Sequence, residues 1–335
     1  MKLAPLAAFA LAAVLAPTAR PAPGGAPVLA FPLACEPGRT CEVQHYVDRD
    51  PGPGTRDYRC GPQTYEKHNG IDIRLLDMAA ERRGVAVLAA AAGKVTRLRD
   101  GVTDISIRAT GAASVANQEC GNGVVVDHGN GWETQYCHMA RGSLVVKAGD
   151  PVQAGTPLGR VGLSGNTEFP HLHLTVRHGG QVVDPFAPDM SDPDMSDSGA
   201  CKPQPSMWSA KALASMTYRS GAVLNAGFAG GAVTMAEVED AQVAPASSQA
   251  PYLVAYARAI GLLAGDVIAL ELKGPDGASL AASRLPALDR WKAQHIAYVG
   301  KKRPPAGWAP GVYVADYQVL RAGKVAVSRR FEMRF

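Results

Sequence analysis

The 335-residue chain lacks several features that mark other classes of protein. Its formal net charge is only +4, and Lys and Arg are spread out, with no basic patch interleaved with aromatic residues, so nucleic acid is not an expected partner. Beyond Leu15, no apolar run is long enough for a transmembrane helix. The absence of a Cys-x-x-Cys pair disfavours a structural zinc site built on cysteines. Few stretches keep an uninterrupted helical pattern, which leaves a chain of short strands and turns.

The amino terminus has the pattern of an export signal. Met1-Lys2 precedes an apolar run from Leu3 to Leu15, which has the length of a signal-peptide core and is too short to span a bilayer. We predict a signal peptide over residues 1–22, with the cleavage site left open, and an exported protein, periplasmic or extracellular. An even number of cysteines in an exported chain favours disulfides over free thiols; the six lie at positions 35, 41, 60, 120, 137 and 201.

A shift in composition divides the chain into two predicted domains. Roughly 310 residues after the leader exceed the usual size of one domain. Residues 189–209 are acidic and proline-broken, which predicts a linker, with calcium binding as the alternative. Short strand-like runs fill residues 210–335 and predict a β-sandwich similar to immunoglobulin-like modules. Residues 23–188 are β-rich too, with residues 76–83 as the best helix candidate, so we expect an all-β protein whose first domain is an antiparallel sheet.

The run from Phe169 to Val176 alternates apolar and polar residues, which predicts a strand with Leu172 and Leu174 in the core. His171 and His173 then project together from the other face, ~7 Å apart. One imidazole can bind a metal while the other stays free for proton transfer.

His68 and Asp72 add an imidazole and a carboxylate, donors that zinc accepts at roughly 2.0–2.2 Å. Gly70, followed by the β-branched Ile71 and Ile73, predicts a bend entering a strand. With one histidine of the His-x-His pair, these residues make three protein ligands. Three ligands leave free the fourth position, which a catalytic zinc keeps for water.

Two β-rich runs flank Asn130-Gly131, the strongest local hairpin signal in the chain. Because this hairpin brings Cys120 and Cys137 near each other, theirs is the disulfide we expect first. His138 follows the second strand, where simple alternation places it on the face of Tyr136 and opposite Cys137.

Three motifs, taken in order, resemble a known family. His68-x-x-x-Asp72, the stretch from Tyr136 to Met139, and His171-Leu172-His173 are similar in order and approximate spacing to the signature of lysostaphin-type zinc metalloendopeptidases, which cut peptidoglycan peptides. The resemblance covers roughly residues 60–188, and the three motifs together are specific, whereas one His-x-His is weak. It implies a central zinc groove, with the zinc ligands His68, Asp72 and His173 and the catalytic histidines His138 and His171.

The resemblance also implies a mechanism and a partner. Zinc would polarise the scissile carbonyl and lower the pKa of its bound water toward ~7. Of His138 and His171, one would take the water's proton and the other would stabilise the oxyanion or protonate the leaving amine, and the sequence does not say which. The expected cofactor is Zn²⁺ and the expected partner is bacterial peptidoglycan, while the partner of the C-terminal domain stays unknown.

Two other functions stay open at this stage. A non-catalytic wall-binding or amidase-activating protein could use the same fold, although the intact set of five residues counts against it. The chain could also be an exported zinc protease that acts on proteins. The segment from Arg20 to Leu33 could block the groove as a propeptide.

Other polar residues near the motifs have simpler interpretations. We expect His128 and His178 to be hairpin or solvent residues, and His45 and His295 to lie on the surface. Glu168 precedes the His-x-His pair, where substrate contact and ordinary loop polarity are both open.

Overall fold

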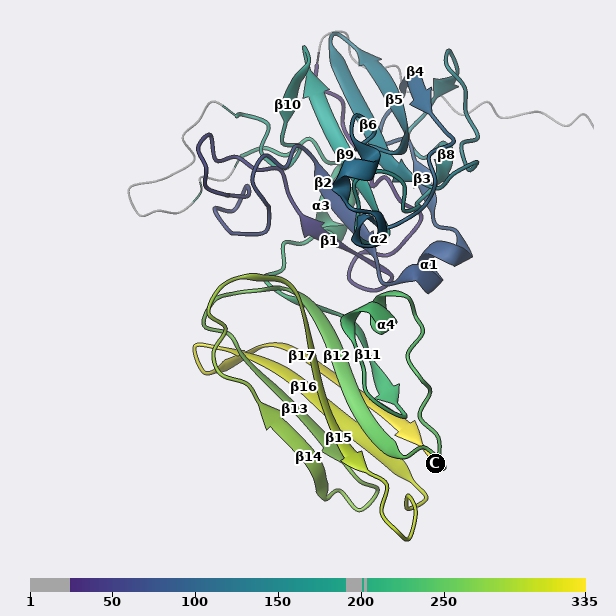
Figure 1. Ribbon diagram of the computed structural model, residues 1–335. Helices are drawn as coiled ribbons and strands as arrows, with labels where there is room; N and C mark the ends of the chain where they lie inside the picture. Colours follow the sequence, from purple (N-terminus) through teal and green to yellow (C-terminus); the bar gives the residue numbers. More distant parts are fainter. Residues whose placement is uncertain (1–24, 191–200, 202–203) are drawn as a thin grey trace, which may run out of the picture.

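The computed structural model describes residues 25–190, 201 and 204–335, which form two β-rich parts (Figure 1). We call residues 25–219 the N-terminal part and residues 220–335 the sandwich. The predicted signal peptide, and most of the acidic segment with its calcium-binding alternative, lie outside the described residues. Among the described helices, none has the length and apolar character needed to cross a membrane.

An antiparallel sheet of eight strands forms the centre of the N-terminal part. Its strands neighbour one another in the order β1, β2, β9, β6, β5, β4 and β7, and β10 pairs with β9. Because β2, β9 and β6 are central, their side chains are held in place by strands on both sides. The strands are β1 Cys41–His45, β2 Ile71–Leu75, β4 Gly93–Arg99, β5 Asn122–Gly129, β6 Trp132–Met139, β7 Pro151–Val152, β9 His171–His178 and β10 Gln181–Val183, with β3 Ala86–Leu88 and β8 Pro157–Arg160 as a separate pair.

Helices in the described residues are few and short. The predicted helix over residues 76–83 is confirmed by α1, whose N-cap residue Asp77 accepts a hydrogen bond through Oδ1 from the backbone N–H of Ala80 at 2.9 Å. The sheets dominate both parts, so the all-β prediction is confirmed. The helices are α1 Met78–Arg83, α2 Ile107–Thr110, the 3₁₀ helix η1 Ala112–Val115, α3 Ala210–Ser215 and α4 Met235–Glu239.

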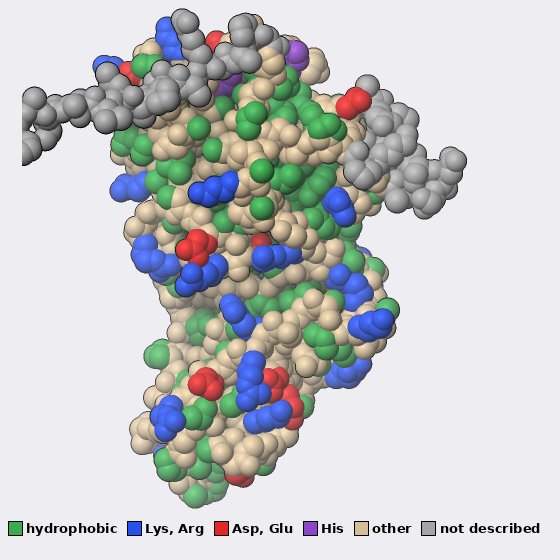
Figure 2. Space-filling view, turned by 180° about the vertical axis from the view of Figure 1, so that it is seen from behind, with side chains coloured by type: hydrophobic (Ala, Val, Ile, Leu, Met, Phe, Trp, Pro, Cys, Tyr) green, Lys and Arg blue, Asp and Glu red, His purple; other side chains and the backbone are tan. Residues whose placement is uncertain are grey.

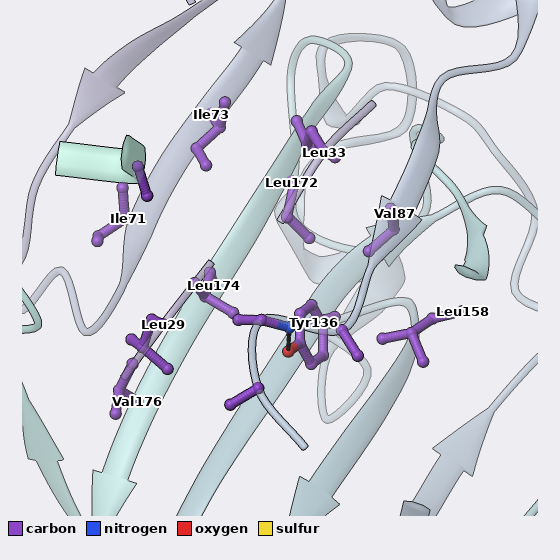
Figure 3. Packing of buried hydrophobic residues seen from close by; sticks show 14 of the residues in the cluster. Leu29, Leu33, Ile71, Ile73, Val87, Tyr136, Leu158, Leu172, Leu174 and Val176 are labelled. Carbon is purple, nitrogen blue, oxygen red and sulfur yellow. Dashed lines mark hydrogen bonds between the residues drawn. The ribbon is translucent and has the colours of Figure 1, made fainter. Parts of the chain in front are cut away.

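The inner face of the main sheet is apolar because its strands alternate. In β9, Leu172, Leu174 and Val176 are all buried, as the alternation predicts. Figure 3 shows them packed near Leu29 and Leu33, which belong to the same hydrophobic cluster. Leu29 and Leu33, from the segment that we considered as a propeptide, are therefore part of this core.

The predicted hairpin at Asn130-Gly131 is confirmed. Asn130 and Gly131 have φ angles of 54° and 82°, the left-handed backbone that a tight turn between β5 and β6 requires. Both residue types tolerate this conformation, which is why the pair is a reliable signal.

All six cysteines form disulfides, including the pair expected from the hairpin. The bond of Cys201, which lies within the acidic segment, ties that segment to the loop before β2. The three bridges are Cys35–Cys41, Cys60–Cys201 and Cys120–Cys137.

Two facing sheets form the sandwich, as predicted. One has the order β11, β12, β15 and the other the order β14, β13, β16, β17, and their inner faces share one apolar cluster. The arrangement is immunoglobulin-like with one difference: the fourth strand lies beside the third, whereas immunoglobulin constant domains pair it with the fifth. The strands are β11 Ala222–Ala229, β12 Tyr252–Leu262, β13 Val267–Lys273, β14 Ser279–Arg284, β15 Lys292–Lys302, β16 Val312–Arg321 and β17 Lys324–Arg334.

The junction between the two parts differs from the predicted linker. Met207 and Trp208 are buried in the core of the N-terminal part, and Met216, just after α3, joins them. Trp208 also forms a backbone bridge with Leu29. Because these large apolar side chains gain stability by burial in the first core, we propose a boundary near residue 219 in place of the linker over residues 189–209.

Charged side chains are distributed over both parts. Seen from behind, Lys and Arg lie scattered over the surface, with Asp and Glu beside several of them (Figure 2). Over the whole sequence, 34 basic residues nearly balance 30 acidic ones.

Candidate active site

The five predicted site residues meet on the outer face of the central sheet. Asp72 in β2 pairs with His173 in β9, which in turn pairs with Cys137 in β6. Directly opposed residues share one face of a sheet, so a carboxylate and an imidazole stand side by side next to a disulfide. His68 lies in the loop before β2, and His171 lies two residues before His173.

Three potential ligand atoms converge here. His68 Nε2 lies 3.2 Å from both Asp72 Oδ1 and His173 Nδ1, and the latter two atoms are 2.9 Å apart. A tetrahedral zinc with bonds of about 2.0–2.1 Å would hold its ligand atoms about 3.3 Å apart. The spacing of this trio therefore fits a small tetrahedral cation.

Hydrogen bonds on the far side of each ring leave these nitrogens free to bind a metal. His68 Nδ1 lies 2.6 Å from the carbonyl oxygen of Tyr46, which only accepts, so the proton sits on Nδ1. His173 Nε2 lies 3.0 Å from Asn69 Oδ1 and can donate to it, which leaves a lone pair on Nδ1. Three lone pairs facing one another at this range repel unless a positive charge lies between them, so the donor set fits a metal ion.

Gly70 makes room for His173. A Cβ atom at position 70 would lie 2.5 Å from His173 Nε2 and 2.7 Å from the carbonyl oxygen of Leu174. A side chain would push the ring out of place, so the close approach of this backbone explains the glycine.

The other two imidazoles face the same cluster. His138 Nδ1 lies 2.8 Å from the carbonyl oxygen of Ser164, and His171 Nδ1 lies 2.9 Å from that of Phe169. Each Nδ1–H donates to its carbonyl, so each neutral ring keeps Nε2 as an acceptor. The ring centres are 4.6 Å apart, and His171 Nε2 is 3.3 Å from Asp72 Oδ1.

Two overlapping groups in the described residues could hold a metal. One is the trio of His68, Asp72 and His173, and the other joins His173 to His138 and His171. Only the first contains a carboxylate, whose charge offsets that of a divalent cation. We therefore favour the first group as the ligand set.

His138 faces the cluster because β6 bulges at this point. Cys137 and His138 together oppose the single residue Gly123 of β5, and His138 has a left-handed φ of 61°. Our prediction that His138 shares a face with Tyr136 is therefore wrong. Tyr136 points into the core, and the extra residue of the bulge turns His138 to the outer face.

The Cys120–Cys137 disulfide fastens this bulge. The backbone N–H of His138 also donates to the carbonyl oxygen of Cys120 at 2.8 Å. Cys120 is therefore joined to both residues of the bulge, to Cys137 by the disulfide and to His138 by the hydrogen bond. A left-handed residue other than glycine costs on the order of 1 kcal/mol, and such strain persists only where the surroundings enforce it.

His45 is buried, contrary to our prediction that it lies on the surface. It is 6% exposed, and its Nδ1 lies 3.0 Å from Asp72 Oδ2. This contact holds the second oxygen of the carboxylate while Oδ1 faces the metal cluster. The sequence offered no motif for it, because its link to Asp72 comes only from the pairing of β1 with β2. His295 is partly exposed.

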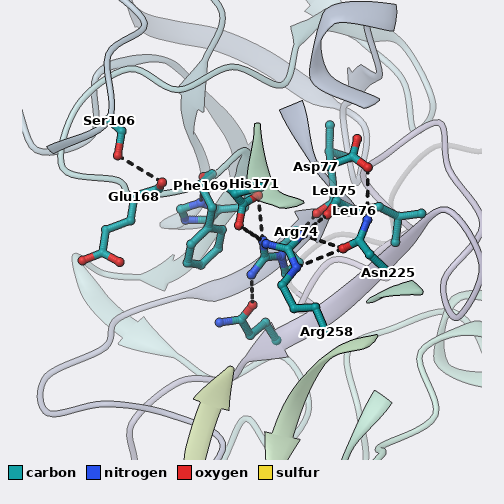
Figure 4. Close-up of polar contacts among 12 residues, drawn as sticks. Arg74, Leu75, Leu76, Asp77, Ser106, Glu168, Phe169, His171, Asn225 and Arg258 are labelled. Atoms are coloured by element: carbon teal, nitrogen blue, oxygen red, sulfur yellow. Dashed lines mark hydrogen bonds and ion pairs between the residues drawn. The ribbon is translucent and has the colours of Figure 1, made fainter. Parts of the chain in front are cut away.

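Arg74 is a further site residue that sequence analysis missed. It is fully buried, and its guanidinium carbon lies 4.1 Å from the ring centre of Phe169, whose carbonyl accepts from His171 (Figure 4). Nη1 donates to Gln44 Oε1 at 2.7 Å, and Nη2 donates to both oxygens of Glu239 at 2.7 and 3.0 Å. A charged residue within the apolar run of β2 was the available signal.

Burial and neighbouring charges set the protonation of the cluster. Burial lowers the pKa of His138 well below its usual value, and nearby His171 and His173 lower it further. Burial also lowers the pKa of His173, against the opposing effect of Asp72. Burial alone would raise the pKa of Asp72, but without a metal the charges of His68 and His171 in their protonated forms, and the hydrogen bonds that His171 and His173 then donate, outweigh it and hold the pKa of Asp72 well below its usual range. An ionised carboxylate and neutral imidazoles are the forms that bind metals.

His68 behaves differently. Burial opposes its charge, but the charge and hydrogen bond of Asp72 outweigh that effect and raise the pKa of His68. A metal ion therefore competes with a proton for the space between His68 and Asp72.

A groove opens in front of the cluster. It holds about 360 Å³ and is lined by Tyr65, Asn69 and Glu119 besides the histidines. Along the outer face it continues into a hollow of about 520 Å³ that contains Arg97 and Arg99. The two hollows share Cys120, Gln135 and Arg177, so they form one continuous surface.

The remaining polar residues keep simple roles. His128 Nδ1 and Nε2 lie 2.8 Å from Ala92 O and Thr134 Oγ1, and His178 is exposed and stacked on Trp132. Both are hairpin residues, as predicted. Glu168 forms a 2.8 Å ion pair with Arg108 at the surface.

Comparisons with known proteins point to one family. The model of peptidase family M23 matches residues 66–185. The chain is 32% identical over 143 residues to the DD-carboxypeptidase/endopeptidase Mpg of Neisseria meningitidis, which is 42% of this chain and 27% of Mpg. It is 36% identical over 85 residues to the murein hydrolase activator EnvC of Escherichia coli, which is 25% of this chain and 20% of EnvC. Among solved structures, the catalytic domain of the prophage-encoded M23 protein EnpA from Enterococcus faecalis is 23% identical, with 48% of this chain and 96% of that chain covered and a TM-score of 0.33.

The chain spans about a quarter of the length of Mpg and a fifth of that of EnvC, so each likeness concerns only a part of the relative. The segment matched by the family model contains every predicted ligand and catalytic histidine. Residues 66–185 are therefore a peptidase domain of family M23, the lysostaphin type.

Proposed function

We propose that this chain is a zinc-dependent endopeptidase that hydrolyses peptide bonds, in cross-links or stem peptides, of bacterial peptidoglycan. The observation that carries the proposal is the convergence of His68 Nε2, Asp72 Oδ1 and His173 Nδ1 to within 3.2 Å, with two further imidazoles beside them. A purely structural zinc site would have four protein ligands and no need of additional bases.

The residues of the trio would hold Zn²⁺. When bound, the ion supplies Lewis acidity, which polarises a peptide carbonyl and lets water act as a nucleophile near neutral pH. The hydrogen bonds from His68 to Tyr46 and from His173 to Asn69 fix both rings in the orientation that ligation needs.

His138 and His171 hold and move protons at Nε2. Because each Nδ1–H is committed to a backbone carbonyl, each ring can accept a proton at Nε2 and return it from the same atom. One of the two takes the proton of the attacking water. The other stabilises the developing oxyanion or protonates the leaving amine.

The shape of the groove and the names of the relatives support a polymer substrate. The groove runs from the histidines along the sheet to Arg97 and Arg99, long enough to bind residues beyond the bond that is cut. Mpg is named a carboxypeptidase and endopeptidase, and EnvC a murein hydrolase activator. Arg177, half-buried between the two hollows, suits the carboxylates of wall peptides.

We also propose that the protein is exported, to the periplasm or beyond. Three disulfides are compatible with an oxidising compartment. The amino-terminal sequence supports this with the pattern of a signal peptide.

The test is digestion of purified peptidoglycan, followed by mass spectrometry of the released muropeptides. We expect fragments with new peptide termini, loss of the activity on chelation and recovery with zinc. A protein that binds peptidoglycan or activates an amidase without cutting any peptide would contradict the proposal. Cleavage of unfolded proteins but not of peptidoglycan would replace it with a general protease.

A further inference from the structure

The sandwich is in direct contact with the residues behind the metal cluster. Helix α4 lies at the end of the sandwich that faces the N-terminal part (Figure 1), and its last residue, Glu239, is 4% exposed. Both oxygens of Glu239 accept from Arg74, and Arg258 of β12 donates to the same carboxylate. One carboxylate of the sandwich thus lies between two fully buried guanidinium groups.

Arg258 anchors this contact from the side of the sandwich. It also donates to the backbone oxygen of Leu76 and, at 2.7 Å, to Asn225 Oδ1. Asn225 in turn donates to Asp77 at 3.1 Å, the N-cap of α1 (Figure 4). The sandwich is therefore hydrogen-bonded to the residues around the end of β2, which lies three residues after Asp72.

A hydrogen-bond chain leads from this contact to the proposed metal ligand. A guanidinium group can only donate, so the Gln44 atom that lies 2.7 Å from Arg74 must be the amide oxygen. The amide nitrogen of Gln44 therefore faces His45. Gln44 Nε2 then donates to His45 Nε2 at 3.3 Å. His45 must carry its proton on Nδ1, which donates to Asp72 Oδ2 at 3.0 Å.

A second contact supports the same ring. Trp291, just before β15 of the sandwich, lies edge-on to His45 with the ring centres 6.1 Å apart. His45 is thus held by the sandwich directly and through Glu239, Arg74 and Gln44.

We propose that the sandwich is a positioning element of the metal site: Glu239, acting through Arg74 and Gln44, fixes the tautomer of His45 and so aims Asp72 Oδ1 at the metal. The inference rests on the metal site of the proposed function. It assigns to the sandwich a role inside the enzyme, in place of a role as an independent binding module.

The test compares Glu239→Gln with Glu332→Gln, which removes the same charge from an exposed position on β17. In the metal-free protein, ¹⁵N NMR of the imidazoles should show His45 as the Nδ1–H tautomer. We expect a mixture of tautomers in Glu239→Gln and no change in Glu332→Gln. Unchanged His45 signals in Glu239→Gln would overturn the proposal.

Cobalt binding, measured by competition with a chelator, provides the second readout. Partners that contact a ligand directly contribute about 10- to 100-fold to metal affinity, so we expect such a loss in His45→Ala and roughly 3- to 10-fold in Glu239→Gln. If the chain of hydrogen bonds transmits the effect, the double variant should bind cobalt no more weakly than His45→Ala. If the loss of cobalt affinity in the double variant equals the product of the losses in the two single variants, the proposal is overturned.

Glu239→Asp covers the case in which Glu239→Gln does not fold, because it keeps the buried charge and only withdraws the carboxylate from Arg74. It should show the same change at His45, and wild-type signals there would contradict the inference. The NMR readout needs neither metal nor substrate. An absence of peptidoglycan hydrolysis would therefore contradict the proposed function alone.

Discussion

The N-terminal part and the sandwich bury very different side chains. Among the described residues, the sandwich core is a set of apolar side chains from two facing sheets, whereas the N-terminal part buries histidines, carboxylates and Arg74 beside its core. The sandwich buries three charged residues. Asp266 pairs with Arg321 of the sandwich itself, while Glu239 and Arg258 meet Arg74 at the junction.

This difference favours the proposed location of the chemistry in the N-terminal part. Buried polar groups lower stability unless each one is satisfied, so folds keep them where function needs them. The N-terminal part carries many of them around the proposed metal, and others elsewhere, such as Arg49 and Asp184. Two of the three buried charged residues of the sandwich, Glu239 and Arg258, lie where it contacts that part, in agreement with the proposed positioning role.

The largest effect is expected at the carboxylate of the trio. Asp72→Ala should lose the metal and, with it, several kcal/mol of transition-state stabilisation, so activity should fall on the order of 10⁴-fold. Asp289→Ala, an exposed carboxylate of the sandwich, should change neither metal content nor activity. If Asp72→Ala keeps its metal and its activity, the location of the chemistry is wrong.

The proton-transfer histidines should separate catalysis from metal binding. His138→Ala should lower activity by about 10²- to 10⁴-fold while the zinc content, measured by atomic absorption, stays near wild type. His178→Ala, which removes an exposed imidazole from β9, is the control and should retain activity. Loss of zinc in His138→Ala would place this ring among the ligands.

The junction should matter for stability far more than the outer surface of the sandwich. Glu239→Ala leaves two buried guanidinium groups without their carboxylate, so urea unfolding should show a loss of about 3–5 kcal/mol. Glu332→Ala should cost no more than about 0.5 kcal/mol. Equal and small losses would mean that the two parts are held together elsewhere.

The smallest effect is expected at Arg177, where the two hollows of the groove meet. Arg177→Ala should raise KM for wall peptides by about 3- to 10-fold, equivalent to about 0.7–1.4 kcal/mol, with kcat unchanged. Arg284→Ala on the sandwich should leave KM as it is. A fall in kcat without a change in KM would argue against a role for Arg177 in substrate binding.

The parts of the site that the sequence predicted depend on short-range rules. Alternation placed Leu172 and Leu174 in the core and His171 and His173 on the other face. Asn130-Gly131 predicted the hairpin, and the hairpin predicted the Cys120–Cys137 disulfide. Each of these follows from neighbouring residues in a strand or turn.

The errors and omissions come from long-range contacts. A left-handed, non-glycine residue in a bulge has no clear sequence signal, so the side of the sheet that His138 faces was wrong. His45 acquires its role only when β1 pairs with β2. The link from Arg74 to Glu239 spans 165 positions, and no local pattern indicates it.

Met207 and Trp208 extend the first core past the acidic segment, which composition alone marked as a linker.

Anomalous X-ray diffraction from zinc-loaded crystals, measured above and below the zinc absorption edge, tests the central claim most directly. The account predicts one zinc peak per chain, bonded to His68 Nε2, Asp72 Oδ1 and His173 Nδ1, with His138 and His171 outside bonding distance. A peak held by His138, His171 and His173, or no peak in the groove, would contradict it.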